Sequence, residues 1–143
     1  MKIFSILGYL LMVTGILGLF FTQSLFSSFP LTIALQVIAL LLMFWARKTL
    51  GMRSFHLSAE PTKGVLITSG PYKYIRHPIY AAVCLFVLAS VIGSFSLLSL
   101  LCALVVIIGA ILRIFCEEKS LLKIYPEYAE YSHKSKRMIP FVF

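Results

Sequence analysis

Charged residues are scarce in this sequence. Only 13% of its 143 residues are charged, and aspartate is absent, so all five acidic residues are glutamates. Soluble globular domains carry about 25% charged residues, whereas 60% of this chain is hydrophobic. This composition excludes an ordinary soluble domain. It also excludes intrinsic disorder, which requires low hydrophobicity, and it indicates an integral membrane protein.

Two long stretches, residues 3–46 and 78–112, contain no charged residue at all. A helix crosses the hydrocarbon core with about 20 residues, and each stretch is interrupted near its middle, the first before Pro30 and the second at Gly93-Ser94. Proline suits the first turn of a helix. The sequence therefore predicts an all-α, polytopic membrane protein with about four transmembrane helices in two hairpins, near 4–26 with 30–46 and near 78–92 with 96–112.

The second pair of predicted helices is short. Short hydrophobic segments either thin the bilayer locally or enter only part of it, and both alternatives remain open. We treat residues 1–143 as a single domain, with two helices and a loop in 1–62 and a cofactor-binding core in 63–143.

Lysine and arginine are absent from both predicted turns. Lys2 precedes the first stretch, the loop 47–77 carries six basic residues with one glutamate, and the tail 113–143 carries six with four glutamates. Because basic residues are enriched in cytoplasmic segments, we expect the N-terminus, the central loop and a helical tail to be cytoplasmic. We expect the protein in the inner or plasma membrane of a prokaryote.

Ionisable groups are also missing inside all four predicted spans. Transporters and pumps place such groups within the bilayer, where they mark a substrate or ion pathway, so this absence counts against a proton-coupled pump. Three unpaired cysteines, Cys84, Cys102 and Cys116, do not have the spacing of a zinc site or a disulfide framework, and we expect no metal. Polar chemistry is therefore expected at the cytoplasmic membrane face.

One cluster of polar residues precedes the third predicted span. Pro78 is placed in the first turn of the helix, where free N–H groups favour an anion, and His77 and Tyr80 lie three residues apart. Arg76, His77 and backbone amides could hold a carboxylate or phosphate here. The alternative is an interfacial belt in which the tyrosines anchor at the headgroups while Lys73 and Arg76 extend towards water.

A second cluster, at the end of the fourth span, combines Arg113 with Glu117 and Glu118. Arg113 and Glu117 are four residues apart and share a helical face, whereas Glu118 lies ~100° around the helix. The alternative is a solvated pair worth only ~0.3–0.5 kcal/mol. Both clusters belong to one hairpin whose ends meet at the same membrane face. A zwitterionic ligand such as S-adenosylmethionine would fit an anion-binding end beside a carboxylate.

The two clusters and the tail together resemble the isoprenylcysteine carboxyl methyltransferase family of membrane methyltransferases, which is related to the phospholipid methyltransferases. The resemblance covers about residues 63–141. It is carried by Leu66-Ile67-Thr68-Ser69-Gly70-Pro71-Tyr72, Arg76-His77-Pro78-Ile79-Tyr80, Arg113 with Glu117-Glu118, Tyr125-Pro126-Glu127-Tyr128-Ala129-Glu130-Tyr131, and Lys136-Arg137-Met138-Ile139-Pro140.

This resemblance implies a helical membrane enzyme that binds S-adenosylmethionine beneath a tail containing Tyr128, Tyr131 and Arg137. Arg113 would be the catalytic residue, facing the methyl acceptor. Ala82 stands where the family often has glycine, and the chain lacks the extra N-terminal helices of larger relatives. By motif, the cofactor-binding residues would be Gly64, Val65, Leu66, Ile67, Tyr72, His77, Pro78, Ile79, Tyr80, Glu117 and Glu118.

The resemblance leaves the methyl acceptor open among a carboxylate, an amine, a thiol and a phospholipid headgroup. We expect a lipophilic or small-molecule acceptor, and an isoprenylcysteine-type carboxylate is favoured. We also expect contacts with membrane lipids and no obligate protein partner. Two alternatives are an NADPH-dependent membrane reductase of the sterol reductase type and a non-enzymatic membrane protein. The net charge of +8 does not indicate nucleic-acid binding, because the basic residues are interfacial and no base-stacking module is present.

Overall fold

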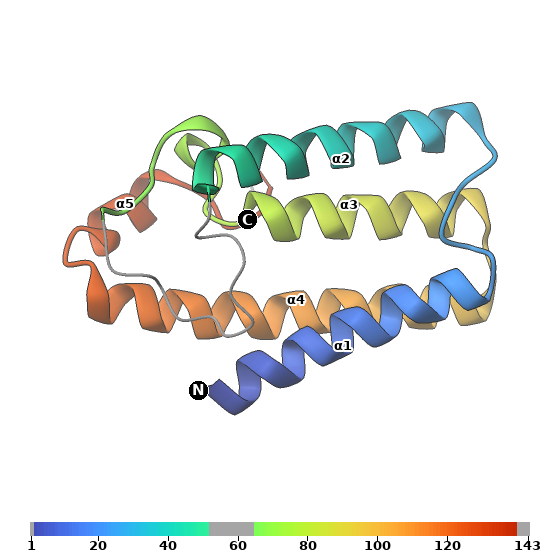
Figure 1. Ribbon diagram of the computed structural model, residues 1–143, viewed down its shortest axis with the longest axis horizontal. Helices are drawn as coiled ribbons and strands as arrows, with labels where there is room; N and C mark the ends of the chain where they lie inside the picture. The colour runs from blue at the N-terminus through green and yellow to red at the C-terminus, as the bar shows by residue number, and fades with distance from the viewer. Residues whose placement is uncertain (1, 52–64, 140–143) are drawn as a thin grey trace.

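Four long antiparallel helices and a short helical tail form the molecule (Figure 1). A computed structural model describes residues 2–51 and 65–139. The elements are α1 (Lys2–Phe21), α2 (Pro30–Leu50), the 3₁₀ helix η2 (Gly70–Lys73), α3 (Pro78–Gly93), α4 (Leu97–Ile124) and α5 (Tyr128–Lys134). The prediction of an all-α polytopic membrane protein is confirmed: α1, α2 and α4 are long and apolar enough to cross a membrane, and α3 is a shorter apolar helix.

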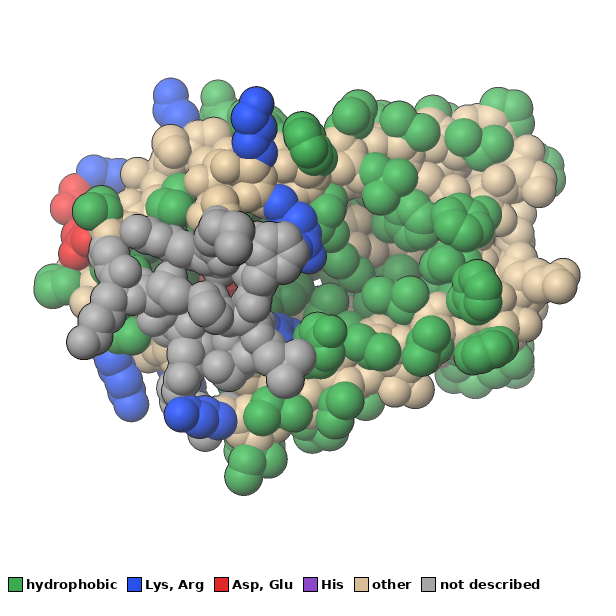
Figure 2. Space-filling model, in the orientation of Figure 1, with side chains coloured by type: hydrophobic (Ala, Val, Ile, Leu, Met, Phe, Trp, Pro, Cys, Tyr) green, Lys and Arg blue, Asp and Glu red, His purple; other side chains and the backbone are tan. Residues whose placement is uncertain are grey.

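The helices pack in the order α2–α3–α4–α1, so α1 lies against α4 and α2 lies against α3. Both hairpin turns are at one end of the bundle, and the start of α3, the end of α4 and α5 are at the other (Figure 1). Charged side chains gather over the end that carries α5, and hydrophobic side chains cover the helices beyond it (Figure 2). The fold thus separates an apolar body from a charged end.

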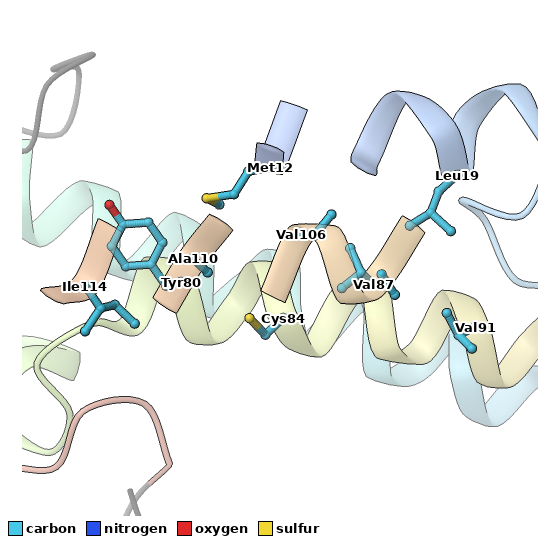
Figure 3. Close-up of a cluster of buried hydrophobic side chains, with 10 residues drawn as sticks. Met12, Leu19, Tyr80, Cys84, Val87, Val91, Val106, Ala110 and Ile114 are labelled. Atoms are coloured by element: carbon cyan, nitrogen blue, oxygen red, sulfur yellow. The ribbon is translucent and has the colours of Figure 1, made fainter. Parts of the chain in front are cut away.

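A core of buried hydrophobic side chains joins α1, α3 and α4 along their length (Figure 3). Small residues within it let the helices approach closely, which is how helices pack in lipid, where no hydrophobic force drives them together. The core consists of Met12, Leu19, Tyr80, Cys84, Val87, Val91, Ala103, Val106, Ala110 and Ile114.

Helix α1 ends at Phe21, five residues before the predicted boundary at residue 26. Gln23 adopts a left-handed backbone with φ of 54°. Its N–H donates to the Phe20 carbonyl, and the Ser24 N–H donates to the Leu19 carbonyl. These two bonds form a Schellman motif, which satisfies the last carbonyls of a helix. Because glutamine rarely adopts this conformation, the sequence did not reveal that α1 ends here.

Helix α4 continues to Ile124, well beyond the predicted end at residue 112. Its 28 residues span ~42 Å at ~1.5 Å per residue, more than the ~30 Å of a hydrocarbon core. The last turns therefore extend past the apolar body and place Glu117 and Glu118 on a rigid helix at the charged end.

A polar cluster fastens the first turn to α2 and α3 inside the apolar body. The buried Gln36 amide donates to the Leu25 carbonyl at 2.8 Å and to Ser90 Oγ at 2.9 Å. Ser90 Oγ in turn donates to the same Leu25 carbonyl at 2.7 Å. Ser27 and Thr32 are joined by a hydroxyl–hydroxyl hydrogen bond. These side chains satisfy backbone groups that lipid cannot, and no motif in the sequence indicates that role.

Glycines set the distance between α1 and α4. A side chain at Gly15 would place its Cβ 2.6 Å from the Cys102 carbonyl oxygen and 2.6 Å from Val106 Cγ2. A Cβ at Gly109 would lie 2.5 Å from the Gly8 carbonyl oxygen. Since backbone atoms cannot move aside as a flexible side chain can, these positions require glycine for close helix packing.

We predict that Gly15→Leu destabilises the protein by about 3 kcal/mol or more, because overpacking of a core usually costs about 1–3 kcal/mol and here the obstacle is backbone. The measurement is thermal unfolding in detergent. Thr14→Leu, which adds the same side chain at the neighbouring exposed position, is the matched control and should unfold near the wild-type temperature. Equal melting temperatures for the two variants would contradict the close packing of α1 against α4.

Candidate functional site

The candidate site lies at the charged end, where the start of α3, the last turns of α4 and the chain after α5 meet. Pro78 occupies the first turn of α3 and His77 is its N-cap residue. Glu117 and Glu118 lie on α4. The connection through Gly93–Leu97 folds α3 back onto α4, so residues about forty positions apart in sequence become neighbours.

His77 lies between the two glutamates and is fully buried. Its Nδ1 is 3.5 Å from Glu117 Oε2, and its Nε2 is 3.5 Å from Glu118 Oε1. Burial, the largest single influence, lowers the pKa of His77, but the Glu117 and Glu118 carboxylates together outweigh it and hold the pKa above its ordinary value. The imidazolium form therefore links two carboxylates that point in different directions around α4.

Glu117 faces Arg113 and α3. The Tyr80 hydroxyl donates a short hydrogen bond to Glu117 Oε1, and Arg113 Nη2 is 3.8 Å from the same oxygen. Arg113 Nε donates to the Tyr80 hydroxyl oxygen at 2.8 Å. The Arg113 side chain is almost entirely buried, with 5% of the residue exposed. A tyrosine hydroxyl thus connects the buried guanidinium to the carboxylate.

Glu118 faces the tail and is held by two arginines. Arg76 Nε donates to Glu118 Oε1 at 3.1 Å, and Arg137 Nη2 lies 3.0 Å from Glu118 Oε2. Arg76 Nη1 also donates to the carbonyls of Ser132 and Ser135, both at 2.5 Å. Charge-assisted hydrogen bonds of this kind are stronger than bonds between neutral groups. Glu118 therefore connects α4 to the segment before α3 and to the segment after α5.

The tail closes over this end through backbone contacts as well. Residues Ile75 and Lys136 form a parallel bridge. The Arg76 N–H donates to the Lys136 carbonyl at 2.7 Å, and the His77 N–H donates to the Arg137 carbonyl at 2.9 Å. The Tyr131 hydroxyl donates to the Tyr72 carbonyl at 2.6 Å. The backbone N–H groups of Arg76 and His77, together with the Arg76 side chain, are therefore engaged by the tail in this structure.

The structure brings together five of the predicted site residues, namely His77, Tyr80, Arg113, Glu117 and Glu118. Tyr72 is buried in η2 under the tail, and Pro78 and Ile79 form the first turn of α3. Val65 is largely exposed, and Leu66 and Ile67 are half-buried, in an irregular segment before η2. Gly64 lies outside the described residues.

Among residues 2–51 and 65–139, two buried side-chain polar atoms have no hydrogen-bond partner, His77 Nε2 and the Tyr128 hydroxyl. Burial, and after it the Glu118 carboxylate, raises the pKa of Tyr128, which places this hydroxyl in the electrostatic surroundings of the cluster. Buried polar groups normally find a partner. His77 Nε2 nevertheless faces Glu118 Oε1 at 3.5 Å as an ion pair, so of the two atoms the Tyr128 hydroxyl is the one that could receive a polar ligand group.

The cluster can bind groups of either charge. Arg76, Arg113 and Arg137 are cationic donors, whereas Glu117 accepts hydrogen bonds and is the more accessible carboxylate, with 25% of its side chain exposed against 12% for Glu118. This set suits a ligand that carries a carboxylate together with an ammonium or hydroxyl groups. The exposed part of the Glu117 carboxylate would be the partner of the ammonium or hydroxyl groups.

Sequence reasoning missed the contribution of α1 to this site. Arg113 Nη1 donates to the Ser5 carbonyl oxygen at 3.4 Å, a contact that a backbone atom makes regardless of residue type. Only the glycine at position 8, which lets α1 approach α4, hints at this contact in the sequence.

We predict that His77 stabilises the fold mainly in its charged form. Because its folded pKa is raised above the unfolded value of about 6.5, this stabilisation is complete below about pH 6.5 and is lost as pH rises through the folded pKa. The melting-temperature difference between wild type and His77→Gln should therefore shrink from about pH 6 to about pH 9. His133→Gln, at an exposed position on α5, should follow wild type throughout. A difference that grows with pH would refute this prediction.

Comparison with known protein families matches residues 27–128 to the phospholipid methyltransferase family. The match includes every residue of the candidate site on α3 and α4 and leaves α1 outside. No curated protein and no solved structure gives a significant match. Since the match covers well over half of the chain and agrees with the resemblance seen in the motifs, the chain belongs to the phospholipid methyltransferase family of membrane methyltransferases, which includes the isoprenylcysteine carboxyl methyltransferases.

Proposed function

We propose that the protein is an S-adenosylmethionine-dependent membrane methyltransferase that methylates a lipophilic or small acceptor. The observation that carries the proposal is the cluster of Arg113, Tyr80, Glu117 and His77, where motifs from two helices of the matched region converge at the charged end. Motif resemblance favours an isoprenylcysteine-type carboxylate as acceptor. A phospholipid headgroup, an amine or a thiol are the other acceptor classes.

The two glutamates have different roles in this proposal. Glu118 is enclosed by Arg76, Arg137 and His77 and holds the tail in place. Glu117 has one hydroxyl donor and a more accessible side chain, and it would hold the ribose hydroxyls or the ammonium group of the cofactor. The buried Tyr128 hydroxyl, which has no hydrogen-bond partner, would offer a further polar contact.

Arg113 would face the acceptor. Its guanidinium is held by Tyr80 and by Glu117 on one side, so a carboxylate or phosphate on the acceptor would meet a cation of fixed orientation. Bound S-adenosylmethionine supplies an already activated methyl group on its sulfonium. The protein therefore contributes mainly positioning and exclusion of water, and no strong base is required for a carboxylate or thiolate acceptor.

The charge distribution supports a cytoplasmic site. Basic side chains lie at the end with α5, and the described turns at the other end carry none. Under the positive-inside rule, the start of α1, the connection between α2 and α3, and the tail face the cytoplasm. We propose the inner or plasma membrane of a prokaryote as the location.

We predict that Glu117→Gln weakens binding of S-adenosylmethionine at least tenfold, because hydrogen bonds to a charged group contribute about 1.5–3 kcal/mol and tenfold in affinity corresponds to about 1.4 kcal/mol. Isothermal titration calorimetry on detergent-purified protein measures the change. Glu130→Gln removes an exposed carboxylate that pairs with Lys134 on α5 and is the matched control, with wild-type affinity expected. Near-normal binding by Glu117→Gln would overturn the assignment of this residue.

The acceptor can be identified directly. Purified protein is incubated with methyl-labelled S-adenosylmethionine and a total extract of lipids and small thiols, and the labelled product is then characterised. NADPH titrated in the same calorimeter is the companion experiment. Binding of NADPH without binding of S-adenosylmethionine would favour the reductase alternative, and binding of neither would refute the proposed function.

A further inference from the structure

Helix α1 reaches Arg113 from the side opposite α3. The Ser5 carbonyl oxygen accepts from Arg113 Nη1 at 3.4 Å, and the Arg113 Cζ lies 5.5 Å from the centre of the Tyr9 ring, over its face. Ser5 and Tyr9 are four residues apart, so one turn of α1 presents both groups. The guanidinium is thus enclosed by α1, α3 and its own helix α4.

This approach depends on the glycine between the two contacts. A Cβ at Gly8 would lie 2.8 Å from the Gly109 carbonyl oxygen and 2.9 Å from Arg113 Cγ. Any larger residue would push α1 away from the base of the arginine side chain. Gly8 therefore brings the Tyr9 ring within cation–π distance, which extends to ≈6 Å.

The contacts of Arg113 restrict its rotation in complementary ways. Tyr80 fixes the Nε edge at 2.8 Å, and Ser5 accepts from Nη1. A hydrogen bond acts in the plane of the guanidinium, whereas an aromatic ring attracts the cation through its face. Tyr9 acts on the charge through the face of its ring and does not itself occupy an N–H donor of the guanidinium.

We propose that Tyr9 is a positioning residue that orients Arg113 towards the methyl acceptor, so that α1 completes the acceptor half of the site. The inference rests on the proposed function. It concerns a helix outside the matched residues 27–128. Tyr9 is partly exposed, at 38%, and its ring contacts the site through Arg113. It should therefore influence use of the acceptor and leave cofactor affinity unchanged.

The test compares Tyr9→Leu and Tyr9→Met with Tyr9→Phe and Tyr9→Trp in membrane vesicles, using labelled S-adenosylmethionine and a dilution series of total lipid extract. Loss of the ring should raise the half-saturating extract concentration about three- to tenfold, while the dissociation constant for S-adenosylmethionine stays within about twofold. Tyr9→Phe and Tyr9→Trp retain an aromatic face and should behave as wild type. Phe4→Leu, an aromatic-to-leucine change at an exposed position of the same helix, is the matched control.

A double variant tests whether Tyr9 acts through Arg113. Residues in contact give non-additive effects, so Tyr9→Leu should add less than about twofold to the defect of Arg113→Lys. The proposal is overturned if the leucine and methionine variants saturate like wild type, if Tyr9→Phe is equally impaired, or if cofactor affinity falls in parallel. A wild-type protein that transfers no methyl group would refute the proposed function, and the positioning role with it.

Discussion

The buried charge of Arg113 is the constraint on which the rest of the site depends. A guanidinium at the edge of an apolar bundle must be paired and hydrogen-bonded, because desolvating an unpaired charge is expensive. Tyr80, Glu117 and the Ser5 carbonyl meet this need from three helices. The same arrangement fixes α1, α3 and α4 relative to one another at the charged end. The geometry of the site and the packing of these three helices therefore depend on the same contacts.

Much of the architecture was readable from the sequence because membrane solvation imposes strong patterns. Uncharged stretches predicted the helices, and motif order predicted that His77, Tyr80, Arg113 and Glu117 would meet. Helix ends were less predictable. Gln23 ends α1 through a rare backbone conformation, and the end of the uncharged stretch at residue 112 did not mark the end of α4, which continues to Ile124. Glu118 lies ~100° around α4 from Glu117, and only the fold shows that the two nitrogens of one histidine, His77, reach both.

Other features left no readable pattern. Arg76 was expected to be available to an anion, yet it pairs with Glu118 and two tail carbonyls, which only the folded tail can supply. The polar cluster of Gln36 and Ser90 joins residues 54 positions apart, and such pairings follow from helix packing. A single sequence specifies which polar groups need partners. Which residues supply those partners is determined by the three-dimensional arrangement.

The packing of α1 against α4 has a consequence for assembly in the bilayer. Helices insert in chain order, and the partner of α1 is the last of the four long helices. Until α4 arrives, the glycine face of α1 has only lipid beside it, and the contact that forms later is of long range in sequence, a kind that slows folding. Docking of α1 should therefore occur late in folding, and it brings Ser5 and Tyr9 into contact with Arg113.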